Sequence, residues 1–214
     1  THALSVEARR RGASVAIQGW SPYGDLCYVG VGARIEMPTI QGWMPLDFGS
    51  PYALSIDLGS GDLTEGAKRP TYSDAERAKL LALLSSAGSE IDSASVRVGQ
   101  FFRSFNKVLA LQNDPDDPLQ FSSGSTGQYV GRSFLSNAHL PGVSSAAVAD
   151  ALIHEGIHAL LYMQERQRAW VTDVRLFDST PRIRSPWTGV KLSVRSFMQA
   201  CFVWYGLLQF WCIA

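Results

Sequence analysis

The sequence predicts an α+β fold, mainly helical, in which a small sheet lies beside a helix that carries an HExxH motif. Three observations predict this class. Residues 1–70 combine turn residues with short β-type runs, and residues 71–214 contain long stretches of apolar residues at helical spacing. One of these stretches includes the sequence His-Glu-Gly-Ile-His. No repeat or linker divides the chain, so we expect a single domain over residues 1–214.

The first part of that domain, residues 1–70, is expected to form loops with a few short strands. The β-type runs cover 26–31 and 52–58, and turn sequences rich in Gly, Ser and Pro separate them. A helix is expected to begin after Ser73, because Ser73 and Glu76 have the spacing of a capping box. A second helix is predicted over 89–111, and the prolines and acidic turn formers that follow cannot continue it.

The helical part, residues 71–214, also contains the motif and the elements around it. Residues 121–127 predict a flexible polar loop and residues 128–135 a strand, either paired within a small sheet or forming its edge. An edge strand above the active-site helix holds an extended peptide in zinc peptidases. Serines at 144 and 145 are expected to cap a helix over 146–162, and a final apolar helix is expected over 192–211.

Bulk composition narrows the class of partner. The formal net charge is zero, so no global positive field favours nucleic acid or an anionic membrane. The apolar run 200–214 is shorter than the ~20 residues that cross a bilayer, so we expect no membrane segment. The three cysteines form no disulfide framework, which favours a cytoplasmic location. Composition leaves the oligomeric state open.

The HExxH motif predicts a metal site on the 146–162 helix. His154 and His158 are four residues apart and project from one face, so both imidazoles can reach one divalent cation. Glu155 points about a quarter turn away from them. At that position its carboxylate can contact a metal-bound water rather than the metal itself. Structural zinc commonly takes four closed ligands that include cysteine, and the cysteines here are badly placed for that. The motif therefore favours a catalytic site.

Two classes of enzyme use such a site. In a zinc peptidase or amidase, Glu155 would act as the general base that activates water for attack on a carbonyl. In an iron oxygenase, two histidines and one further ligand leave positions for a cosubstrate and O₂. Glu165 is ~10 Å from His158 along the helix axis and too far for the same ion. The third ligand is open among these residues: His139, Asp173, Asp178, an acidic residue further upstream, and Gln199.

Residues 120–212 resemble the HExxH-type, 2-oxoglutarate-dependent peptide β-hydroxylases that modify ribosomally made peptides. The resemblance consists of the Ser-rich stretch 122–125 with the strand after it, the helix segment 152–158, the Ser-Pro-Trp sequence at 185–187, and the apolar C-terminal helix. It implies Fe(II) and 2-oxoglutarate as cofactors, and a peptide or amino-acid residue as substrate. We therefore favour a metal-dependent oxygenase over a zinc hydrolase. A non-catalytic binding protein that retains the fold is a further alternative.

The chain departs from the family pattern at three places, one of which is Val190-Lys191 where the family has an Arg-Pro pair. Thr188 stands where the family has the arginine after Ser-Pro-Trp, and Gln199 falls where the family has a downstream histidine. Gln199 is thus the candidate for the third-ligand position, although an amide oxygen is a weaker donor than imidazole. The missing arginine would clamp the cosubstrate carboxylate in two bonds. The basic residues that can replace it are Arg184, Lys191 and Arg195.

Overall fold

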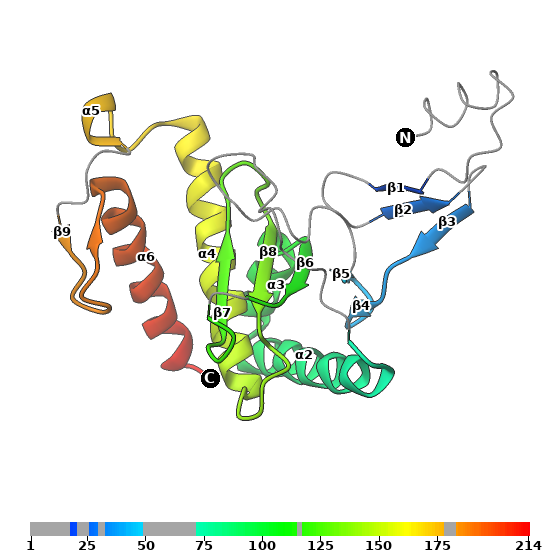
Figure 1. Cartoon of the computed structure of the whole chain (residues 1–214). Helices are drawn as coiled ribbons and strands as arrows, with labels where there is room; N and C mark the ends of the chain where they lie inside the picture. Colours follow the sequence, from blue (N-terminus) through cyan, green and yellow to red (C-terminus); the bar gives the residue numbers. More distant parts are fainter. Residues whose placement is uncertain (1–17, 21–25, 30–32, 49–71, 115–116, 178–182) are drawn as a thin grey trace, which may run out of the picture.

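The computed structural model describes residues 18–20, 26–29, 33–48, 72–114, 117–177 and 183–214. Long helices pack against a small mixed sheet, which confirms the predicted α+β class. The helices are α2 (Asp74–Ala94), α3 (Val96–Phe105), α4 (Ser145–Gln167), α5 (Val174–Phe177) and α6 (Val194–Trp211). Figure 1 shows α4 between the sheet and α6, with α2 crossing beneath them.

The main sheet has five strands in the order β4-β5-β6-β8-β7. The strands are β4 (Thr39–Ile40), β5 (Met44–Asp47), β6 (Val108–Gln112), β7 (Ser122–Ser125) and β8 (Arg132–Ser136). β6 is parallel to both β5 and β8, whereas β4 and β7 pair antiparallel to their neighbours. β6 is buried along almost its whole length, as expected for a strand with parallel neighbours on both sides.

Smaller sheets lie outside this core. A three-stranded sheet is formed by β1 (Gln18–Trp20), β2 (Leu26–Val29) and β3 (Ala33–Glu36), and a hairpin by β9 (Ile183–Arg184) and β10 (Lys191–Leu192). The strand predicted within 26–31 is therefore confirmed, while the run at 52–58 lies outside the described residues. No helix in the described ranges is long and apolar enough to cross a membrane.

The predicted capping box opens α2. The Ser73 hydroxyl accepts from the backbone N–H of Glu76, and the Glu76 carboxylate accepts from the backbone N–H of Ser73 at 2.8 Å. The helix then continues to Ala94, further than predicted. Ser95 has an extended backbone, so α2 ends before it and α3 begins after it. Its side chain caps the start of α3.

The prediction of one helix over 89–111 is wrong. Its last residues form strand β6 instead, and Asn106 ends α3 in an extended conformation. The apolar residues 108–111 match helical spacing and a buried strand equally well. Pairing with β5 on one side and β8 on the other decides between these alternatives, and this pairing depends on tertiary structure.

The region before the motif also differs from prediction. Residues 122–125, expected to be part of a flexible loop, form strand β7 at the edge of the sheet. The strand expected over 128–135 begins only at Arg132, and this strand, β8, lies between β6 and β7. The edge strand beside the motif helix is therefore β7, and β8 cannot offer a free edge to a peptide.

The two helices that build the site are confirmed. α4 begins at Ser145 after the N-cap Ser144, whose side chain accepts from the N–H of Ala147, and it contains the whole motif. α6 follows the N-cap Ser193 and packs along α4 through a short buried row that includes Val203 and Leu207. Gly206 brings the helices close together, because a Cβ at this position would lie 2.6 Å from Cδ1 of Ile157 on α4.

Candidate metal centre

The two motif histidines lie beside each other on consecutive turns of α4. The ring centroids of His154 and His158 are 5.0 Å apart, and both side chains are half-buried. The His158 ring also stacks on Tyr162, one turn further along α4, with centroids 5.8 Å apart. The spacing of the motif thus places two imidazoles on one face of a buried helix, as the sequence predicts.

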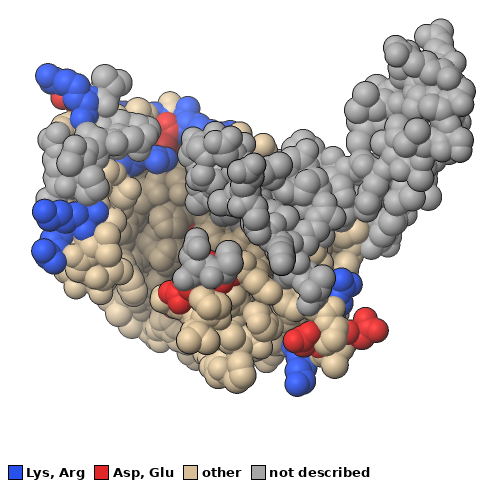
Figure 2. Space-filling model, viewed as in Figure 1, with Lys and Arg blue, Asp and Glu red and all other residues tan. Residues whose placement is uncertain are grey.

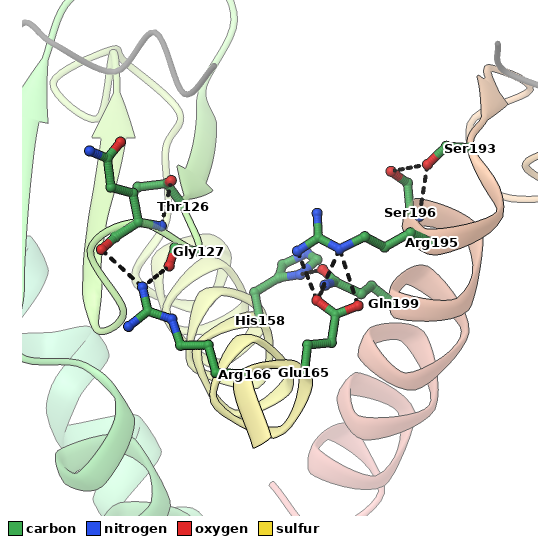
Figure 3. A network of polar contacts seen from close by, with 10 residues as sticks. Thr126, Gly127, His158, Glu165, Arg166, Ser193, Arg195, Ser196 and Gln199 are labelled. Atoms are coloured by element: carbon green, nitrogen blue, oxygen red, sulfur yellow. Dashed lines mark hydrogen bonds and ion pairs between the residues drawn. The ribbon is translucent and has the colours of Figure 1, made fainter. Parts of the chain in front are cut away.

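A chain of polar contacts runs from His158 to α6 (Figure 3). Nδ1 of His158 lies 2.9 Å from Oε1 of Gln199. Nε2 of Gln199 donates to Oε2 of Glu165 at 2.9 Å. The Arg195 guanidinium in turn donates to both oxygens of Glu165, at 2.7 to 3.1 Å. We call these four residues the His158 network.

The His158 network determines which ring nitrogen of His158 is available. The Glu165 carboxylate beside Arg195 accepts hydrogen bonds, so the amide nitrogen of Gln199 faces Glu165 and its oxygen faces the imidazole. The amide oxygen can only accept, and Nδ1 of His158 must therefore carry the proton. This leaves the lone pair on Nε2, which is the arrangement that a metal-binding histidine needs.

Burial also favours the neutral form of the His158 imidazole. Desolvation lowers the pKa of His158 below its ordinary value of 6.5, and His154 and Arg195 lower it further, although Glu155 and the hydrogen bond to Gln199 partly oppose the shift. Burial likewise raises the pKa of the neighbouring Tyr162 hydroxyl. The low-dielectric environment therefore favours the neutral imidazole, and only a neutral imidazole binds a metal ion.

Glu155 occupies a different environment from the histidines. Its side chain is only 2% exposed, and Oε1 accepts from the Ser123 hydroxyl of β7 at 2.7 Å. The other oxygen, Oε2, is buried and has no hydrogen-bond partner among the described residues. A buried carboxylate oxygen without a partner is costly, so this atom marks a place where a donor or a cation would be favoured.

A cleft of about 390 Å³ opens on the N-terminal side of His154. The first turns of α4 form its floor, the start of β7 one wall, and the end of α6 the other. Its lining residues are Phe121, Ser122, Ser123, Ala146, Ala147, Asp150, Ala151, His154 and Trp211. In Figure 2 the surface is hollowed between α6 and the sheet. The cleft gives a small molecule or an extended chain access to one motif histidine.

The other residues proposed from the sequence are spread over the structure. Arg195 belongs to the His158 network, whereas Arg184 and Lys191 face each other across the β9–β10 hairpin and are exposed. His139 packs against Tyr72, with ring centroids 5.6 Å apart. Asp173 forms an ion pair with its neighbour Arg175. Asp178 lies outside the described residues.

No group of three or more His, Cys, Asp or Glu side chains is arranged to hold a metal ion within the described ranges. Of these residue types, only His154 and His158 are therefore candidates for metal ligands within the described ranges. Gln199 is adjacent to the pair, as the sequence comparison with the hydroxylases suggests, but its oxygen contacts Nδ1 of His158. Whether it also reaches a bound ion stays a prediction.

Two residues of the site were missed by sequence reasoning. Ser123 was assigned to a flexible loop, and Glu165 was considered only as a ligand and set aside on distance. The signal for Glu165 was its position two turns after His158 on the same helix face, where it can meet residues of a facing helix. For Ser123 the sequence carries no comparable signal. A scan against protein-family models and a search of curated proteins find no match for this chain.

Proposed function

We propose that His154 and His158 bind one divalent metal ion, and that the chain is an Fe(II)- and 2-oxoglutarate-dependent oxygenase acting on a peptide or amino-acid residue. The observation that carries the proposal is the pair of adjacent imidazoles, with His154 lining a cleft and Nε2 of His158 left without the proton by the His158 network. Bound Fe(II) would supply the oxidising chemistry, in which one oxygen atom of O₂ enters the substrate and the other enters succinate.

The residues present fit a two-histidine metal site. Burial favours the neutral form of His158, and Gln199 fixes its Nδ1–H tautomer. The unpartnered Oε2 of Glu155 adds negative charge close to the pair. Two protein ligands leave several positions on the ion for a cosubstrate and O₂, which suits an oxygenase better than a closed structural site.

The position of Glu155 favours the oxygenase over the hydrolase. A general base has to reach the water that it deprotonates. Among the described residues that line the cleft, His154 is present and Glu155 is not. Its carboxylate is instead held beneath β7 by Ser123, which suits a residue that organises the site. Reorientation on substrate binding would restore the zinc peptidase or amidase alternative.

Arg195 is the cosubstrate-binding candidate closest to the histidines. Its guanidinium contacts Glu165, which also contacts Gln199, and it lies over the Tyr162 ring at 5.6 Å. A cosubstrate carboxylate would have to share or replace the pairing with Glu165. Arg184 and Lys191 are exposed by comparison, with Arg184 donating to the carbonyl of Gly189 at 3.0 Å, and the hairpin that carries them precedes α6 directly.

The substrate is expected to lie along β7. This strand is the edge of the sheet, and its Ser122 and Ser123 line the cleft together with His154. An extended peptide finds backbone hydrogen bonds at such an edge. We therefore transfer the role first considered for residues 128–135 to residues 122–125.

Metal binding and turnover are tested separately. Protein reconstituted anaerobically with Fe(II) should contain one ion per chain, and the His154→Ala/His158→Ala variant should contain none, because Ala retains the helix but removes both ligands. His139→Ala is the matched control and should bind as the wild type does. Unchanged metal content in the double variant would overturn the site.

Turnover is then followed as formation of succinate from 2-oxoglutarate in the presence of O₂ and peptide. Succinate formation that requires both histidines supports the oxygenase. Peptide or amide cleavage by zinc-loaded protein, with no succinate from the iron form, would instead establish the hydrolase. Protein that contains metal under neither condition would leave the non-catalytic binding protein as the function.

A further inference from the structure

The cleft beside His154 carries one acidic residue whose role is unassigned. Asp150 lies four residues before His154, so their side chains leave the same face of α4 one turn apart. Among the described residues that line the cleft, Asp150 is the only one with an acidic or basic side chain apart from the histidine itself. The charge of the cleft is thus negative at one end.

The Asp150 carboxylate is held in position by α6. The indole N–H of Trp211 donates to Oδ1 of Asp150 at 2.7 Å. No Lys, Arg or His of the described residues forms an ion pair with Asp150. The rest of the lining is apolar or carries hydroxyl groups, with aromatic rings from Phe121 and Trp211 and small side chains at positions 146, 147 and 151.

This combination favours a cation. A carboxylate attracts a positively charged ligand, and the apolar walls beside it weaken the screening of that attraction by water. The aromatic side chains of Phe121 and Trp211 offer apolar surface to the stem of a long side chain. The alanines on the floor leave room for an alkyl chain. A long side chain that ends in a positive charge fits all three features of the lining.

We propose that the cleft binds a Lys or Arg side chain of the substrate peptide, with its charged group at Asp150. The spacing specifies where that residue stands. Asp150 and His154 are ~6 Å apart along the helix axis, and residues i and i+2 of an extended chain are ~7 Å apart and point to the same side. Figure 1 shows β7 running alongside α4, so a peptide paired to β7 extends in this direction. The basic residue is therefore two positions from the residue that is modified.

The inference rests on the peptide substrate proposed above, but binding is tested without metal or turnover, so its failure and the failure of the oxygenase proposal can be told apart. The probes are two blocked hexapeptides of alanine that carry either lysine or norleucine at position four, and the signal is the indole N–H resonance of Trp211. We expect the lysine peptide to bind wild-type protein at least ~10-fold more tightly at low salt. The preference should disappear in Asp150→Asn, which retains an acceptor for Trp211.

Asp74→Asn, at an exposed position at the start of α2, is the matched control and should retain the preference for lysine. Equal binding of the two peptides to wild-type protein would overturn the proposal. So would a lysine preference that survives in Asp150→Asn, or no binding of the lysine peptide up to ~10 mM. A clear lysine preference in a protein that forms no succinate with iron would retain the cleft assignment and reject the oxygenase.

Discussion

Gln199 connects the two helices of the site because its amide has one accepting and one donating end. The accepting end meets Nδ1 of His158 on α4, and the donating end meets Glu165, two turns further along the same helix. Removing the amide would leave Nδ1 of His158 without its acceptor, whereas Glu165 would retain its hydrogen bonds from Arg195. Gln199 therefore positions His158, whether or not its oxygen also contacts a bound ion.

Replacing Gln199 by Leu should lower metal affinity by roughly 10–100-fold, the usual cost of losing a partner that orients a metal-binding histidine. Competition titration with Zn(II) measures the affinity, and ¹⁵N shifts of the His158 ring report the tautomer in metal-free protein. We expect a mixture of tautomers in the variant and one tautomer in the wild type. Gln209→Leu, on the exposed side of the same helix, should change neither measurement. An unchanged tautomer in Gln199→Leu would refute the positioning role.

Glu155 and Ser123 give a second prediction at the same scale. Glu155→Gln preserves shape and removes charge, and we expect turnover to fall at least ~10²-fold if the carboxylate acts as an acid or base. Ser123→Ala removes the donor to Oε1 and should destabilise the fold by about 1–3 kcal/mol, because it leaves a buried oxygen without a partner. Turnover measurements and urea unfolding separate the two effects. Turnover near the wild-type level in Glu155→Gln would exclude the hydrolase.

The sequence predicted the three motif residues of the site and missed the roles of Glu165 and Ser123, which depend on contacts with a facing element. His154, Glu155 and His158 follow from spacing alone, since a helix fixes their relative directions. Gln199 was one of several candidates for the third ligand, and only the resemblance to the hydroxylases singled it out. Ser123 reaches Glu155 through β7, whose Ser- and Gly-rich sequence is typical of a loop and becomes a strand because β8 pairs with it.

At the scale of elements, Gly156 determines how closely α4 packs against α3. A Cβ at this position would lie 2.8 Å from Nδ2 of Asn106 and 3.2 Å from the Phe101 ring. Asn106 cannot easily move, because its side chain is buried and its Nδ2 donates to the carbonyl of Phe102. A glycine is therefore favoured at this position of the motif because a larger side chain would overlap with α3 and Asn106.

Gly156→Ala sets two effects against each other. Helix propensity favours Ala by about 1 kcal/mol, while overpacking against a pinned neighbour costs about 1–3 kcal/mol. We expect a net loss of stability in urea unfolding. Gly88→Ala is the matched control, because its Cβ meets only the end of the exposed Gln41 side chain, and there the propensity gain should prevail. A stabilised Gly156→Ala variant would show that α3 yields.

At the scale of the whole molecule, the strand order could not be predicted from the sequence. β6 pairs in parallel with strands that precede and follow it by long stretches of chain, and no local pattern encodes these partners. A buried ion pair between Asp47 of β5 and Arg132 of β8 lies across β6, at 3.1 Å. Its burial is visible only once the sheet is assembled, since both side chains are of types usually found at the surface.

Tyr72 joins three separate parts of the fold. It precedes α2, its hydroxyl donates to Oδ1 of Asn113 after β6 at 3.1 Å, and its ring packs against His139 after β8 and against Phe48. Burial, together with the nearby charge of Glu76, raises the pKa of the Tyr72 hydroxyl from 10.0 to about 12. The folded protein thus retains the phenol proton at a pH where the unfolded chain loses it.

The sign of the pH effect follows from this pKa shift. A group with a raised pKa in the folded state contributes stability fully below its unfolded pKa, and the contribution is lost as pH rises through the folded pKa. The free energy of unfolding should therefore fall between pH 10 and about 12, more steeply in the wild type than in Tyr72→Phe. Below pH 10 the variant should be the less stable protein, because the hydrogen bond to Asn113 is missing, and the difference should shrink as pH rises. Urea unfolding at a series of pH values measures both trends, and parallel curves for the two proteins would contradict the assignment to Tyr72.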